Sequence, residues 1–168
     1  MSACIRRIAV LLPLVAWGVL PASAALPAVG VSAPDFAAKS NSGRNVRLSE
    51  LRGQVVLINF WASWCSPCRQ ELPLLSKIYS QYHGAGFALL AVNVDDNRKD
   101  AEVMLKRLDL KFPTLFDGNK SVAKLYGVDT MPATLVIDRD GRVRYVHRGY
   151  YDGYERKYEQ QVRDLLKE

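Results

Sequence analysis

Cysteine and histidine are scarce in this chain, which has three cysteines and two histidines among 168 residues. A structural zinc site needs four such ligands, commonly supplied as two closely spaced pairs. Cys65 and Cys68 form one pair, but Cys4 stands apart from it. His83 and His147 are distant from each other and show no ligand spacing. The sequence therefore predicts no metal site, and half of a zinc site is the less favoured interpretation of the pair.

Charge of one sign is not concentrated in any segment. The formal net charge is +6, from 23 Lys and Arg against 17 Asp and Glu. Acids alternate with bases, as in residues 98–100 and 155–157, which is typical of a solvated surface. We therefore expect no nucleic-acid partner.

The sequence also has no apolar run as long as the ~20 residues that a membrane-spanning helix needs. The apolar run at residues 8–20 is shorter and contains Pro13. Arginines at positions 6 and 7 precede it, and residues 22–24 form a small-residue cleavage pattern. This arrangement is typical of a secretory signal peptide. An uncleaved membrane anchor that leaves the protein facing the periplasm is the alternative.

We therefore expect a cleaved signal peptide over residues 1–24 and a single domain over residues 25–168, a length that suits one core. Export would place this domain in the periplasm, where disulfides persist. Cleavage would also remove Cys4. The exported domain would then keep Cys65 and Cys68, which belong to one motif.

Cys65 and Cys68 lie between an apolar run and a segment of helical periodicity. Residues 55–61 are predicted to form a buried strand, and residues 69–82 repeat apolar side chains at helical spacing. The first turn of a helix has free N–H groups and a positive dipole end, which both favour a thiolate. We expect Cys65 to be the nucleophile, with Cys68 about one turn further on as the resolving thiol. Pro67 fits a first turn because its missing N–H would be unpaired there.

Apolar stretches and turn signals continue along the chain in an alternating order. A loop with a small hairpin is expected first, with short strands at residues 35–36 and 45–48. Further strands are expected at residues 55–60, 87–94, 112–116, 134–137 and 143–146, and helices at residues 69–82, 100–108, 121–126 and 154–166. This order predicts an α/β fold with a central mixed β-sheet and helices on both faces.

The sequence resembles the thioredoxin superfamily, and within it the exported TlpA/ResA-like thiol-disulfide reductases. The matching segments are residues 33–36, 59–68, 92–96 and 126–138, together with Pro73. The resemblance implies a thioredoxin-like fold with an N-terminal β-hairpin extension and an inserted helix. It also implies an enzyme whose redox-active disulfide, Cys65–Cys68, serves without any other cofactor.

The resemblance further implies a cis peptide bond between Met131 and Pro132, lying against the cysteines. A cis bond is accessible to X-Pro at modest cost. The alternative is a trans proline that opens the following strand. We expect Trp64, Pro67, Met131 and Pro132 to contact substrate, with the Met131 backbone pairing with an extended segment. For Trp64, packing on the surface is the alternative.

Thioredoxins have a buried acid in the strand before the motif, where this chain has Asn59. An amide cannot take up a proton, so the nearest substitutes are Asp95 and Asp96 after the next strand. Asp96 is our candidate acceptor for the proton of Cys68, and an ordinary acid at a helix N-terminus is the alternative. Ala133 stands where the cytochrome-c-maturation branch usually has a glutamate, so that specialised role is not expected.

The leading functional prediction is a monomeric reductase that acts on disulfide-bearing exported proteins. Its electrons would come from a membrane thiol-disulfide donor, because the compartment itself is oxidising. A disulfide-forming oxidant or isomerase of the same fold is the first alternative. A peroxiredoxin-like, antioxidant peroxide reductase is the second, although the Pro-x-x-x-Thr-x-x-Cys run of that class is absent. A metal-binding or chaperone module is the non-enzymatic alternative.

Overall fold

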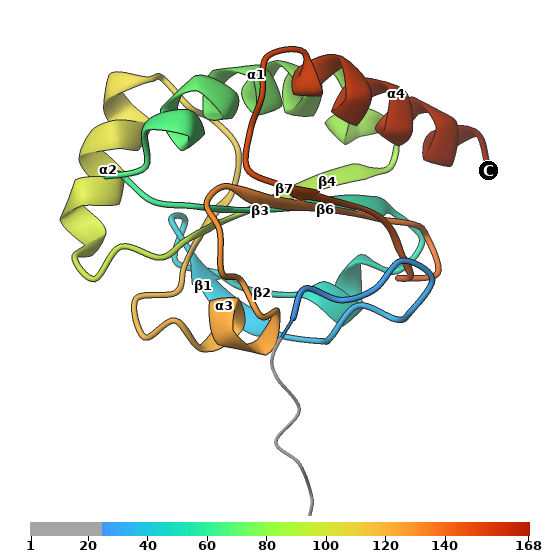
Figure 1. Cartoon of the computed structure of the whole chain (residues 1–168), viewed down its shortest axis with the longest axis horizontal. Helices are drawn as coiled ribbons and strands as arrows, with labels where there is room; N and C mark the ends of the chain where they lie inside the picture. Colours follow the sequence, from blue (N-terminus) through green and yellow to red (C-terminus); the bar gives the residue numbers. More distant parts are fainter. Residues whose placement is uncertain (1–24) are drawn as a thin grey trace, which may run out of the picture.

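The computed structural model describes residues 25–168 (Figure 1), so the predicted signal peptide lies outside the described part of the chain. The sheet has seven strands in the order β2-β1-β5-β4-β3-β6-β7. These strands are β1 (Ala37–Ser40), β2 (Asn45–Arg47), β3 (Val55–Trp61), β4 (Phe87–Asn93), β5 (Thr114–Phe116), β6 (Ala133–Ile137) and β7 (Val143–Arg148). The helices are α1 (Ser66–Tyr82), α2 (Arg98–Arg107), α3 (Ser121–Leu125) and α4 (Tyr154–Lys167), with short 3-10 turns η1 (Leu48–Leu51) and η2 (His83–Ala85).

The sheet is mixed and carries helices on both faces, as the sequence predicts. β3 is parallel to β4 and antiparallel to β6. A parallel pair needs a crossover connection, which α1 supplies. In Figure 1, α1 and α4 cover one face of the sheet and α3 lies on the other.

The central strand β3 is buried along its whole length, which explains its run of Val, Leu, Ile and aromatic residues. One polar residue, Asn59, interrupts the run and is fully buried. In the register with β6, Asn59 lies opposite Thr134 and Phe60 lies opposite Ala133. The end of β3 and the start of β6 therefore meet at one edge of the sheet.

Several predicted boundaries differ from the observed ones, and two of these differences are informative. The first strand is β1 and not residues 35–36, because the Asp35 carboxylate accepts hydrogen bonds from the N–H and hydroxyl of Ser49 and so anchors the start of η1. The apolar spacing from residue 69 marks only the later turns of α1, which begins at Ser66, so Pro67 and Cys68 belong to its first turn, as the motif predicts. Within residues 25–168, no helix is long and apolar enough to cross a membrane.

Candidate active site

Cys65 and Cys68 form a disulfide at the N-terminus of α1, with their Cα atoms 5.3 Å apart. Cys65 is the N-cap of the helix, and its Sγ accepts a hydrogen bond of 3.2 Å from the backbone N–H of Cys68. A free helix-terminal N–H that points at sulfur favours the thiolate once the disulfide is reduced. Cys65 is 4 % exposed and Cys68 is 0 % exposed. Of the two cysteines, Cys65 is therefore the less completely buried.

The loop between β3 and α1 is fixed by Asp95, which follows β4. Both carboxylate oxygens of Asp95 lie 3.0 Å from the backbone N of Ser63, and Oδ1 also accepts from the Ser63 hydroxyl at 3.1 Å. Asn93 donates to Asp95 Oδ2 at 2.8 Å. Asp95 is itself buried. A charge-assisted contact of this kind holds the segment that presents Trp64 and Cys65.

The peptide bond between Met131 and Pro132 is cis, which confirms the sequence prediction. Pro132 precedes β6 and so lies at the sheet edge where β3 ends and the motif begins. The carbonyl oxygen of Pro132 accepts a hydrogen bond of 2.8 Å from Gly149 N–H, just after β7. This bond brings the segment that follows β7 to the cis-proline loop.

Exposed aromatic side chains flank this region on two elements. Trp64, directly before Cys65, is 66 % exposed, and Tyr151, two residues after Gly149, is 65 % exposed. Pro67 is exposed on the first turn of α1. Exposed large apolar groups beside a reactive sulfur are suited to contact a protein substrate. That Trp64, Pro67, Met131 and Pro132 bind substrate stays a prediction.

Glu71 is a buried carboxylate that the sequence analysis missed. It lies on α1 three residues after Cys68 and is 0 % exposed. Its Oε2 accepts a hydrogen bond of 2.8 Å from Asn59 Nδ2. Its Oε1 accepts from Thr134 Oγ1 at 3.1 Å and from the Tyr158 hydroxyl at 2.8 Å. An acid thus reaches the strand position of Asn59 from the neighbouring helix.

Burial raises the pKa of Glu71 to about 7, although the hydrogen bonds from Tyr158, Asn59 and Thr134 each lower it. Desolvation disfavours the charged carboxylate, while donors to its oxygens favour that form. At neutral pH the group is therefore present in both protonation states. A carboxyl with this property one helical turn from a thiol is suited to accept a proton from it.

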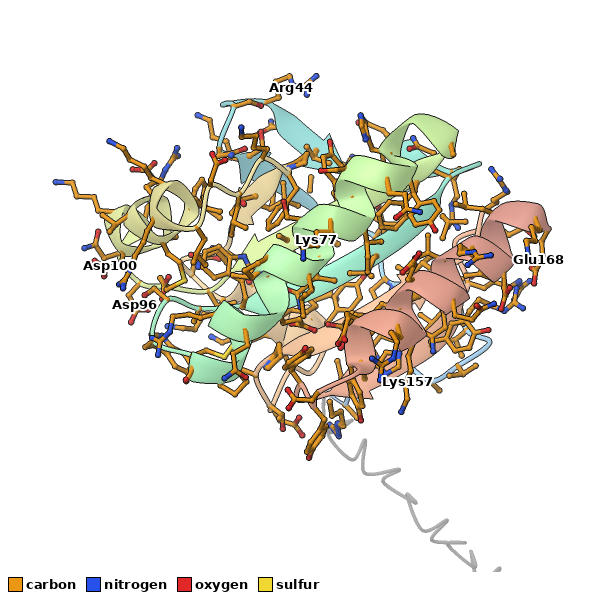
Figure 2. All side chains as sticks on the ribbon, turned by 90° about the horizontal axis from the view of Figure 1, so that it is seen from above. Arg44, Lys77, Asp96, Asp100, Lys157 and Glu168 are labelled. Atoms are coloured by element: carbon orange, nitrogen blue, oxygen red, sulfur yellow. A yellow bond between two sulfur atoms is a disulfide. The ribbon has the colours of Figure 1, made fainter. Side chains whose placement is uncertain are left out.

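Asp96 lies in a different environment from Glu71. Its side chain is 84 % exposed and forms an ion pair with Lys120. Figure 2 shows Asp96 at the periphery of the molecule, near Asp100 of α2. Of the two aspartates after β4, it is Asp95 that contacts the motif loop. A proton-accepting role for Asp96 stays a prediction.

Comparison with known proteins identifies the family. A family model described as "AhpC/TSA family" matches residues 29–146. The chain belongs to the AhpC/TSA family. The thiol-disulfide oxidoreductase ResA of Geobacillus thermodenitrificans is 39 % identical to this family member over 122 residues, which cover 73 % of this chain and 70 % of the relative.

Solved structures agree with this AhpC/TSA assignment. A protein assigned as thiol:disulfide interchange protein DsbE of Chlorobium tepidum has a TM-score of 0.79 and 39 % identity, covering 84 % of this chain and 99 % of that one. A secreted thiol-disulfide isomerase of Corynebacterium glutamicum has a TM-score of 0.70 and 29 % identity, covering 80 % of this chain and 85 % of that one. This AhpC/TSA-family protein is therefore a thioredoxin-like thiol-disulfide oxidoreductase, as the sequence predicted.

The missed Glu71 could have been found from the helical spacing of the oxidoreductase. The buried positions of α1 are Cys68, Glu71, Leu72, Leu75 and Ile78. They follow the i, i+3, i+4, i+7 pattern of a core-facing stripe. A glutamate in that stripe, counted from a reactive cysteine, is the signal for a buried acid.

Proposed function

We propose that this oxidoreductase works as a reductase of protein disulfides, with Cys65 as nucleophile, Cys68 as resolving thiol and Glu71 as proton acceptor. The supporting observation is the asymmetry of the pair: Cys65 caps the helix N-terminus and keeps a little exposed surface, while Cys68 is fully buried one turn from Glu71. Such an arrangement separates capture of the substrate from its release.

The reaction conserves electrons in two exchanges. The Cys65 thiolate attacks one sulfur of the substrate disulfide, forms a mixed disulfide and releases the other sulfur as a thiolate, which takes a proton from water. Cys68 passes its proton to the Glu71 carboxylate and, as a thiolate, attacks the Cys65 sulfur. The second substrate sulfur leaves as a thiolate and also takes a proton from water. The substrate gains two electrons, and the protein is left with the Cys65–Cys68 disulfide.

Glu71 is better supported than Asp96 as the proton acceptor. Glu71 is buried on the helix of the cysteines, and its pKa of about 7 lets it take and release a proton at neutral pH. Asp96 is exposed and paired with a lysine. The direct comparison is between E71Q and D96N, which each replace a carboxylate by an amide of nearly the same size.

We expect E71Q to slow release from the mixed disulfide at pH 7 by about a hundredfold, the lower range for general-base catalysis. D96N should exchange at the wild-type rate. Stopped-flow mixing of each reduced protein with a peptide disulfide between pH 5 and 9 measures both. A slow D96N beside a normal E71Q would assign the role to Asp96 instead.

The substrates are proposed to be disulfide-bearing exported proteins, reached by a monomer in the periplasm. The arginines and apolar run before residue 25 support export, and the Corynebacterium glutamicum relative is described as secreted. Cleavage near residues 24–25 gives a free domain, and an uncleaved leader gives an anchored one. Either form needs a membrane thiol-disulfide donor to return it to the dithiol state.

An oxidant or isomerase is the second candidate, since the structure from Corynebacterium glutamicum is described as an isomerase. The reductase is favoured because the insertion between β4 and β5 is the single helix α2 rather than a separate domain. Titration against glutathione distinguishes the two. A potential near about −270 mV fits a reductase, and one near about −120 mV would identify an oxidant.

A trapping variant tests the roles of the two cysteines. C68A should accumulate mixed disulfides through Cys65 when it is exposed to oxidised periplasmic proteins, because nothing displaces the captured partner. C65A is the matched control and should capture far less, because Cys68 is buried. Capture by C65A and not by C68A would reverse the assignment.

A further inference from the structure

The hydroxyl of Tyr158 connects the C-terminal helix to the buried acid. It donates a hydrogen bond of 2.8 Å to Oε1 of Glu71, and the whole Tyr158 side chain is 0 % exposed. In Figure 2, α1 and α4 lie side by side above the sheet. The Tyr158 ring packs against His147 and Tyr154, with ring centroids 4.9 and 6.0 Å away. This packing holds the hydroxyl in place over the carboxylate.

Tyr158 differs in kind from the amide that also contacts Glu71. The Asn59 Nδ2 group can only donate, so it stabilises the ionised form of Glu71 and not the protonated form. A tyrosine hydroxyl can accept from a carboxylic acid, but the bond that it donates to a carboxylate is charge-assisted and stronger, so it favours the ionised form. Burial and the charge of Glu71 raise the pKa of Tyr158 well above its usual range, so it remains a neutral donor at all relevant pH values. Of the three donors, Tyr158 lowers the pKa of Glu71 most.

The carboxylate of Glu71 is stabilised by hydrogen bonds from neutral groups. Its hydrogen-bond partners on β3, β6 and α4 are an amide and two hydroxyls, all neutral. On its own helix the titratable neighbour is Cys68 once the disulfide is reduced. Tyr150, after β7, has its pKa raised by burial and by Glu155, with a smaller effect from Glu71. His147 packs on Tyr158 and hydrogen-bonds to Gln161, and burial lowers its pKa.

We propose that Tyr158 is a positioning residue whose hydroxyl sets the pH at which Glu71 can take the proton of Cys68. This inference rests on the proposed role of Glu71 as proton acceptor. Without the hydroxyl the ionised carboxylate loses one of its donors, so Glu71 binds its proton at higher pH. Less carboxylate is then free at pH 7, and resolution of the mixed disulfide slows.

The test compares Y158F with Y82F, which each remove one hydroxyl that bridges α1 and α4. Tyr82 is the matched control because its hydroxyl donates to Glu159 at 2.9 Å, away from Glu71. The oxidised protein is used first, since its cysteines do not titrate. Carbon-13 NMR of the Glu71 carboxyl should show a titration midpoint about one pH unit higher in Y158F than in wild type. Y82F should keep the wild-type midpoint.

Kinetics of the reduced protein provide the second part of the test. A midpoint moved by about one unit leaves roughly fivefold less carboxylate at pH 7, so Y158F should resolve the mixed disulfide about fivefold more slowly. The deficit should disappear above pH 9, where Glu71 is ionised in both proteins. A structural defect alone would slow exchange equally at every pH and would overturn the inference.

A measurement on the wild type is independent of how well Y158F folds. The Cζ carbon of labelled Tyr158 should titrate with the same midpoint as the Glu71 carboxyl, because the hydroxyl bonds to that group. A Cζ shift that is flat with pH, or a folded Y158F with an unchanged Glu71 midpoint, would overturn the inference. Normal exchange by E71Q would instead refute the proposed role of Glu71, and the effect of Tyr158 on the Glu71 midpoint would still be measured separately.

Discussion

Two buried carboxylates lie near the cysteine motif, and their partners assign them different tasks. Asp95 accepts hydrogen bonds from the N–H and hydroxyl of Ser63, and these bonds fix the loop that carries Cys65. The hydrogen-bond partners of the Glu71 carboxylate are the side chains of Asn59, Thr134 and Tyr158. Glu71 also shares a helix with Cys68. A carboxylate that holds backbone groups is suited to positioning. One held by rotatable hydroxyls tolerates the gain and loss of a proton.

The D95N variant tests the positioning role. Its amide keeps one acceptor oxygen for Ser63 but turns an NH₂ group toward Nδ2 of Asn93, which leaves that buried donor unpaired. We expect the free energy of unfolding to fall by about 2 kcal/mol, measured by urea denaturation of the oxidised protein. D96N is the control and should change stability by less than about 0.5 kcal/mol, because Asp96 is exposed. Equal losses in the two variants would contradict the role of Asp95.

At the residue scale, the sequence predicted what a local pattern determines. The cysteine pair, its place at the start of a helix and the lack of a protonatable group at Asn59 all follow from neighbouring residues. The contact of Tyr158 with Glu71 depends on how α4 packs on α1, 87 positions away along the chain. Local periodicity cannot predict this contact, because it arises from tertiary packing.

At the scale of elements, strand and helix identities were predictable because β3 and β4 are nearly continuous apolar runs, while α2 and α4 repeat apolar residues at a helical period. The boundary errors lie where side chains compete with the backbone for hydrogen bonds. Asp35 anchors η1 in place of extending a strand, and Cys65 caps α1 earlier than the apolar spacing indicates. Capping contacts of this kind involve residues that are distant in sequence or atypical as caps.

Two segments each supply an exposed aromatic residue: Trp64, directly before Cys65, comes from the β3–α1 loop, and Tyr151 comes from the segment after β7 whose Gly149 N–H bonds to Pro132. We expect W64A and Y151A each to raise KM for an unfolded protein substrate about tenfold, a loss of about 1.4 kcal/mol that is typical of an interface aromatic. Thermal stability should be unchanged, because both side chains are exposed. V103A is the control, since Val103 on α2 is also 66 % exposed. A similar rise in KM for V103A would show that the effect is not specific to this surface.

At the scale of the whole molecule, the buried acid couples catalysis to stability. The pKa of Glu71 is about 7 in the folded protein, against an ordinary value of 4.5. Between these two values the folded protein keeps a proton that the unfolded chain has released. Stability therefore falls as pH rises through this window and reaches its lower plateau above pH 7. Below pH 4.5 the group is protonated in both states and contributes no pH dependence.

The size of this effect follows from the separation of the two pKa values. Between pH 4.5 and 8, the free energy of unfolding of the oxidised wild type should fall by about 3 kcal/mol more than that of E71Q, which has no such group. The lowered pKa of His147 acts in the opposite direction, since stability then rises as pH increases, but it does so in both proteins and cancels from the comparison. Urea unfolding across this pH range measures the difference. Parallel curves for the two proteins would show that Glu71 is ionised in the fold at an ordinary pH, and the site would then lack a base poised near neutrality.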